Sequence, residues 1–60
     1  MPYEEAQALL GQGRCLVALG RGAEAAAPLA AAREIFARLG AKPAIAETGE
    51  LMERIAADSD

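Results

Sequence analysis

Histidine and tryptophan are absent from this sequence, and cysteine, tyrosine and phenylalanine each occur once. With Cys15 as the only thiol, no intramolecular disulfide can form, and a lone thiol without histidine does not make a zinc site. The missing histidine also removes the usual general base and triad member of enzymes. The chain has a single serine, Ser59, and a single threonine, Thr48. We therefore expect no catalytic residue, metal or cofactor, and we predict that the chain is not an enzyme.

Long apolar runs and an excess of basic residues are also missing. No run approaches the roughly 20 apolar residues that span a bilayer, and the acidic N-terminus has no signal-peptide core. The formal net charge is −3, with acidic and basic residues interspersed, whereas a nucleic-acid binder usually carries a basic stripe. These absences predict a cytoplasmic protein whose partners are neither a nucleic acid nor a membrane.

The residues that are abundant favour helices. Alanine dominates the composition, followed by leucine, glutamate and arginine, all of which are strong helix formers. The β-branched residues that strands prefer are few. They are Val17, Ile35, Ile45, Thr48 and Ile55. We predict an all-α fold in one domain over 1–60, of marginal stability because so short a chain buries little of its surface.

Glycine and proline divide the chain into three helical segments, predicted over about 3–19, 23–39 and 43–57. In each segment apolar residues recur at spacings of three and four, as an amphipathic helix requires. Gly20 and Gly40 can adopt the left-handed conformation that ends a helix. Because the first connection is short, the first two helices are predicted to pack antiparallel.

Glycine also occurs inside the predicted helices, where each residue costs about 1 kcal/mol relative to alanine. Gly11 and Gly13 lie in the first helix and Gly49 in the third. A glycine that is kept despite this cost suggests that another helix approaches closely, so we predict close packing at these positions.

Some reactive or charged side chains are expected to be structural. Cys15 lies in a helix beside a leucine, and such a cysteine is usually a small buried hydrophobe. Glutamate and arginine four residues apart predict exposed ion pairs. The two such pairs are Glu34 with Arg38 and Glu50 with Arg54.

The residue order of the first two helices resembles a tetratricopeptide repeat, a unit of about 34 residues in two antiparallel helices. The match runs from Ala6 to Leu39, with Gln12 and Ala37 in place of the usual leucine and terminal proline. The matching positions are Leu9, Gly13, Leu16, Gly20, Ala25, Leu29 and Ala32. The resemblance implies an antiparallel helix-turn-helix repeat plus a third, capping helix, about 1.5 repeats in all. A plain three-helix bundle is the alternative.

The same resemblance implies a protein-interaction scaffold. In this family the first helix of each repeat lines a concave surface that binds a protein or peptide. Carried over to this sequence, that surface consists of Gln7, Leu10, Arg14 and Val17, with Thr48 from the third helix. Arg14 would be the group that holds a peptide carboxylate.

Self-association is the second expectation. A single repeat cannot bury both of its apolar faces, and about three repeats are normally needed for a stable stack. We therefore expect a homo-oligomer, in which copies stack or exchange the third helix. Leu51 and Met52 are predicted to lie at the contact. On the alternative reading, the chain is a structural bundle whose only role is oligomerisation.

Overall fold

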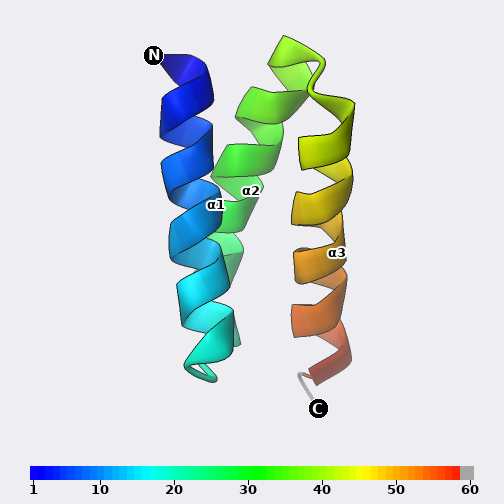
Figure 1. The fold of residues 1–60 in the computed structure, drawn as a ribbon. Coiled ribbons are helices and arrows are strands. Elements are labelled where there is room, and N and C mark those ends of the chain that lie inside the picture. Colours follow the sequence, from blue (N-terminus) through cyan, green and yellow to red (C-terminus); the bar gives the residue numbers. More distant parts are fainter. Residues whose placement is uncertain (59–60) are drawn as a thin grey trace.

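The structure is a computed structural model that describes residues 1–58. It contains α1 (Pro2–Ala18), α2 (Gly22–Leu39) and α3 (Lys42–Asp58). The chain reverses direction at each connection, so α1 and α3 run in the same direction and α2 runs opposite to both (Figure 1). The predicted all-α fold is confirmed, and each helix starts one residue before its predicted first residue.

Two glycines end the first two helices as the sequence predicts. Gly20 and Gly40 have φ angles of 75° and 69°, a left-handed conformation in which a side chain would be strained. After α1, the Gly20 N–H donates to the Val17 carbonyl at 3.0 Å and the next N–H donates to the Leu16 carbonyl at 2.8 Å. The same two bonds follow Gly40. Each set is a Schellman motif, which satisfies carbonyls that would otherwise lack a partner.

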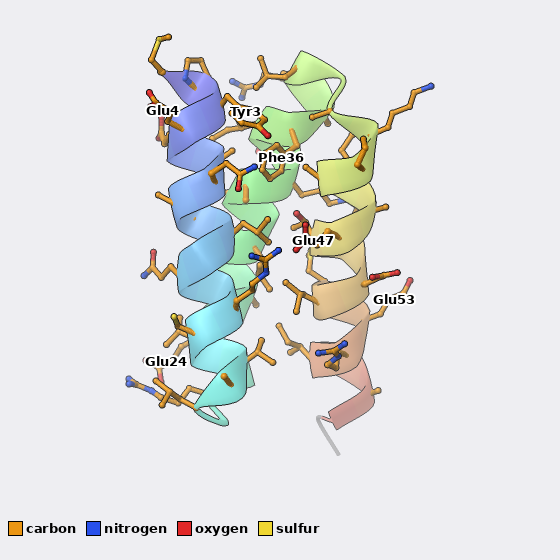
Figure 2. All side chains as sticks on the ribbon, in the orientation of Figure 1. Tyr3, Glu4, Glu24, Phe36, Glu47 and Glu53 are labelled. Carbon is orange, nitrogen blue, oxygen red and sulfur yellow. The ribbon has the colours of Figure 1, made fainter. Side chains whose placement is uncertain are left out.

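The core is centred on α2, which packs extensively against both α1 and α3. Phe36 of α2 is fully buried and points into the space between the helices (Figure 2). Its ring meets that of Tyr3 edge to face, with the centroids 6.0 Å apart. The other buried apolar residues are Ala6, Leu10, Ala25, Leu29, Ala32 and Leu51.

The helices α1 and α2 approach closely at Gly13. A Cβ at this position would stand 2.5 Å from Cγ of Leu29 and closer still to its Cδ2, so no side chain fits while Leu29 keeps its place. The prediction of close packing is therefore confirmed at Gly13. It is wrong at Gly11 and Gly49, where a Cβ would meet nothing within 4 Å.

The third helix places one stripe against the core. Thr48 is fully buried, and its hydroxyl donates to the Ala44 carbonyl at 2.7 Å, so the only buried polar side chain given for the described residues has a partner. Ile45, Met52 and Ile55 are half-buried against the same core. Contacts between α3 and α1 are few, and thus α2 carries most of the packing of α3.

Candidate functional site: the groove between α1 and α3

A groove runs between α1 and α3 at the end of the molecule nearer the C-terminus of each helix. It encloses about 360 Å³. Val17, Ala18 and Leu51 provide its apolar lining, and Arg14, Glu47, Glu50 and Arg54 provide its charged lining. We call this site the α1/α3 groove. It exists because α1 and α3 both pack on α2 without packing closely on one another.

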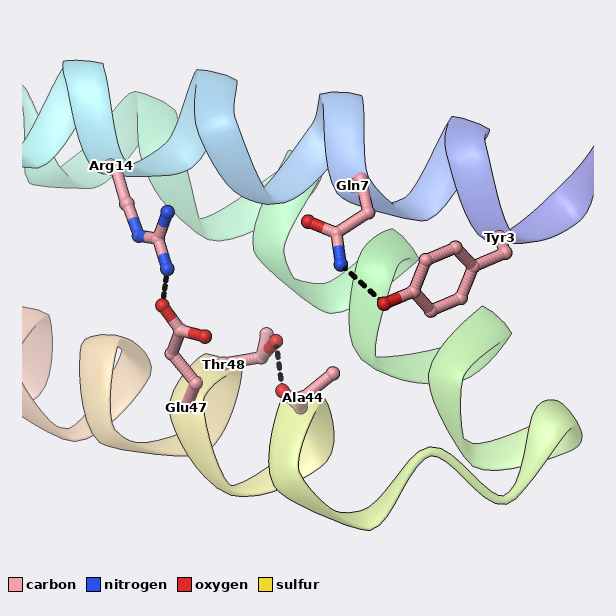
Figure 3. Close-up of polar contacts among 6 residues, drawn as sticks. All are labelled: Tyr3, Gln7, Arg14, Ala44, Glu47 and Thr48. Atoms are coloured by element: carbon pink, nitrogen blue, oxygen red, sulfur yellow. Dashed lines mark hydrogen bonds and ion pairs between the residues drawn. The ribbon is translucent and has the colours of Figure 1, made fainter.

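An ion pair spans this groove at the middle of the two helices. Arg14 reaches from α1 to Glu47 of α3, and the two side chains are 51% and 42% exposed. Figure 3 shows these groups facing each other, with Tyr3 and Gln7 further along the same side of α1. The Gln7 amide donates to the Tyr3 hydroxyl at 2.9 Å. The pair is too exposed to add much stability, but it occupies the guanidinium of Arg14.

Arg54 is the other cation of the groove, and no side chain of residues 1–57 forms an ion pair with it. The predicted pairing of Glu50 with Arg54 is therefore not formed. The predicted pairing of Glu34 with Arg38 is formed, at 2.6 Å. Glu50 and Arg54 both line the α1/α3 groove, so an incoming group can reach both side chains.

Three of the five residues predicted to form the partner-binding surface are accessible. Gln7 and Arg14 are exposed, and Val17 is half-buried at the wall of the groove. The predicted accessibility of Leu10 and Thr48 is wrong, since they are 1% and 0% exposed. Both fill the core instead, because they lie on the parts of α1 and α3 that face α2.

The two residues predicted at a self-association contact also differ in accessibility. Leu51 is only 9% exposed and belongs to the core cluster, so its side chain is not an open surface for another copy. Met52 is half-buried against the core and keeps a partly accessible side chain.

Three residues of the groove, and Tyr3 further along α1, were not predicted as site residues. Glu47, Glu50 and Arg54 were interpreted only as surface charges, and Tyr3 lies outside the stretch that resembles a repeat. A signal for Tyr3 did exist, because Tyr3, Gln7 and Arg14 follow one another at helical spacings. Glu47 gave no comparable signal, since its position opposite Arg14 depends on how α3 packs. The Cys15 expectation is also corrected, because this thiol is exposed on α1.

A second hollow lies on the outer side of the α1–α2 hairpin and encloses about 520 Å³. We call it the α1/α2 face. It combines apolar and charged side chains from the first part of α1 and the last part of α2. These are Pro2, Glu5, Leu9, Ala31, Glu34, Ile35, Arg38 and Leu39.

A metal centre and a membrane span are two other kinds of site that residues 1–57 could form. No cluster of three or more histidine, cysteine, aspartate or glutamate side chains there is suited to hold a metal ion. None of the helices in this part of the chain has the length and apolar character needed to cross a bilayer. The two hollows are thus candidate sites for a partner.

Comparisons with known proteins found no matching family model, no matching curated protein and no matching solved structure. The resemblance to a tetratricopeptide repeat accordingly stays a prediction. The α1/α3 groove and the α1/α2 face are therefore the features from which a function can be inferred.

Proposed function

We propose that this chain is a protein-interaction module of the cytoplasm that binds a short peptide segment in the α1/α3 groove. The observation that carries the proposal is the groove itself, a hollow between α1 and α3 that is lined by both apolar and charged side chains. A concave site of this composition, with a few polar groups to fix orientation, is typical of ligand-binding sites. Two helices of the same direction, held apart by α2, also resemble the concave arrangement of a tetratricopeptide repeat.

The lining suggests the chemistry of the peptide. Val17 and Ala18, the accessible apolar residues of the lining, favour one apolar side chain as an anchor, because apolar contact is the main source of affinity in such sites. Arg54, which forms no ion pair with residues 1–57, favours a carboxylate beside that anchor. The sequence assigned this task to Arg14, but Glu47 already neutralises Arg14. Arg54 is therefore the better candidate for contact with a carboxylate.

Peptide selection followed by mapping would test this proposal. A phage-displayed library of random short peptides would be panned on the immobilised chain, and a selected peptide titrated into ¹⁵N-labelled protein. We expect the shifted amides to cluster around the α1/α3 groove. Arg54→Glu should weaken binding by about tenfold or more, since it places like charges together. Arg33→Glu is the matched control, because Arg33 is exposed on α2 and does not line the groove.

Two results would contradict the proposal. One is a selection that yields no peptide binding to the folded chain. The other is a selected peptide whose shifts lie away from the groove, or whose affinity falls equally in Arg54→Glu and Arg33→Glu. Either result would favour the alternative, a three-helix bundle whose only role is oligomerisation.

A further inference from the structure

We infer that Glu47 sets the charge selectivity of the α1/α3 groove, because it pairs with Arg14 and competes there with any carboxylate of the ligand. This inference rests on the proposed function, in which the groove receives an apolar side chain with a carboxylate beside it. Glu47 acts in it as an internal competitor, and its removal makes a second carboxylate position available.

The core fixes the direction in which Glu47 points. The next residue, Thr48, is fully buried, and its hydroxyl donates to the Ala44 carbonyl at 2.7 Å. Successive residues of a helix lie roughly 100° apart around its axis, so the burial of Thr48 leaves Glu47 on the side of α3 that faces α1 (Figure 3). On α1, Arg14 directly follows Gly13, which is buried against α2. Buried neighbours on both helices thus orient the two charged groups.

The ion pair is a competitor that a ligand can displace. The side chains of Arg14 and Glu47 are 51% and 42% exposed, and both line the groove, so a ligand can reach them. An exposed ion pair changes an equilibrium constant by about fivefold or less. Glu47 therefore weakens the contact between a ligand carboxylate and Arg14 without blocking it.

The other charges of the groove show which ligands this competition disfavours. Glu50 and Arg54 also line the groove, and neither forms an ion pair with the side chains of residues 1–57. A ligand with one carboxylate meets the guanidinium of Arg54. A second carboxylate would have to displace Glu47 from Arg14, and it would be repelled by Glu47 and Glu50. The unmodified groove therefore favours a segment with one carboxylate over a segment with two.

NMR signals of the arginine side chains in ¹⁵N-labelled protein would test the inference at each guanidinium separately. N-acetyl-leucine is the probe, because it carries one apolar side chain and one carboxylate, and the neutral N-acetyl-leucinamide is its control. In the unmodified chain, N-acetyl-leucine should shift the Nε–H signal of Arg54 more than that of Arg14. In Glu47→Gln, the dissociation constant measured at Arg14 should fall by about threefold or more, since the pair is broken and a like charge is removed.

Glu50→Gln is the matched comparison. It removes one negative charge from the same groove, but it does not break the pair at Arg14. The dissociation constant measured at Arg14 should therefore change by less than about twofold. Equal gains in Glu50→Gln and Glu47→Gln would reduce the effect to net charge and overturn the inference. Circular dichroism would verify that both variants keep their helices.

The two arginines separate a failure of this inference from a failure of the proposed function. An Arg54 signal that does not respond to N-acetyl-leucine, together with a peptide selection that yields no binder, would contradict the groove as a peptide site. An Arg14 signal that responds equally in the unmodified chain and in Glu47→Gln, or in neither, would overturn the role of Glu47 whatever Arg54 does. A gain at Arg14 that is specific to Glu47→Gln and absent with N-acetyl-leucinamide would support it.

Discussion

The α1–α2 hairpin and α3 are both built from alanine-rich amphipathic helices, yet different contacts hold them. Within the hairpin, Gly13 lets α1 and α2 approach until Leu29 fills the space a side chain would need. The third helix instead meets the core through one stripe, of which Thr48 and Leu51 are the buried members. Its contacts with α1 are few and include an exposed ion pair.

This difference explains why a groove opens between α1 and α3. Two helices that both pack on a third helix, with few contacts to each other, enclose a space between them. The weaker attachment of α3 is thus what makes the α1/α3 groove accessible. It also means that damage to the hairpin core should destabilise the whole chain, while damage near α3 should have smaller consequences.

The largest difference is expected between Phe36→Ala and Met52→Ala. Removing a fully buried phenylalanine side chain costs about 3–5 kcal/mol, which is comparable to the roughly 3–9 kcal/mol of stability expected for 60 residues. Met52 is only half-buried on α3, so its truncation should cost about 1–2 kcal/mol. Urea unfolding followed by circular dichroism would measure both values. Equal losses would show that α3 and the hairpin are equally integrated.

Intermediate changes in stability, of opposite sign, are expected for substitutions at two nearby glycines of α1. Gly13→Ala should destabilise the chain by about 1–3 kcal/mol because the new methyl group meets the buried Leu29. Gly11→Ala should stabilise it by up to about 1 kcal/mol, since alanine favours a helix and a Cβ at Gly11 meets nothing within 4 Å. Thermal unfolding of the two variants would give the signs. A stabilising Gly13→Ala would refute the close crossing.

The smallest effect is expected at the ion pair between α1 and α3. A double-mutant cycle on Arg14→Ala and Glu47→Ala should give a coupling energy of about 0.2–1 kcal/mol, because both side chains are exposed. The coupling should nearly vanish at about 1 M salt, where the Debye length falls to about 3 Å. The exposed pair Arg21–Glu24 is the control, because its two residues are only three apart in the sequence and do not join separate helices. A much larger coupling would mean that the pair fixes α3 in place.

The sequence predicted more of the fold than of the candidate site. Helix-forming residues and two glycines located all three helices to within about one residue at each end, since these signals act through local backbone preferences. The accessibility of individual side chains was harder to predict. Leu10 and Thr48 were assigned to a binding surface, yet both are buried, because the apolar stripe of a helix does not reveal how far the neighbouring helix extends around it.

The charged residues also show which contacts the sequence can predict and which it cannot. Glu34 and Arg38 pair as predicted, because four residues along one helix bring two side chains together whatever the fold. Glu50 and Arg54 have the same spacing and do not pair, since spacing permits an interaction without requiring it. No spacing rule could predict that Glu47 would meet Arg14, because the two residues lie on helices that are not consecutive.

The sequence by itself determined the helices and their ends, because these depend on helix propensity and on left-handed glycines. Only the tertiary structure decided how deeply each face of α3 is buried and which carboxylate neutralises Arg14. It also decided that the α1/α3 groove and the α1/α2 face stay open. Those features depend on the rotation and distance of each helix relative to the others. Such quantities follow from the packing of many side chains together, which no local pattern contains.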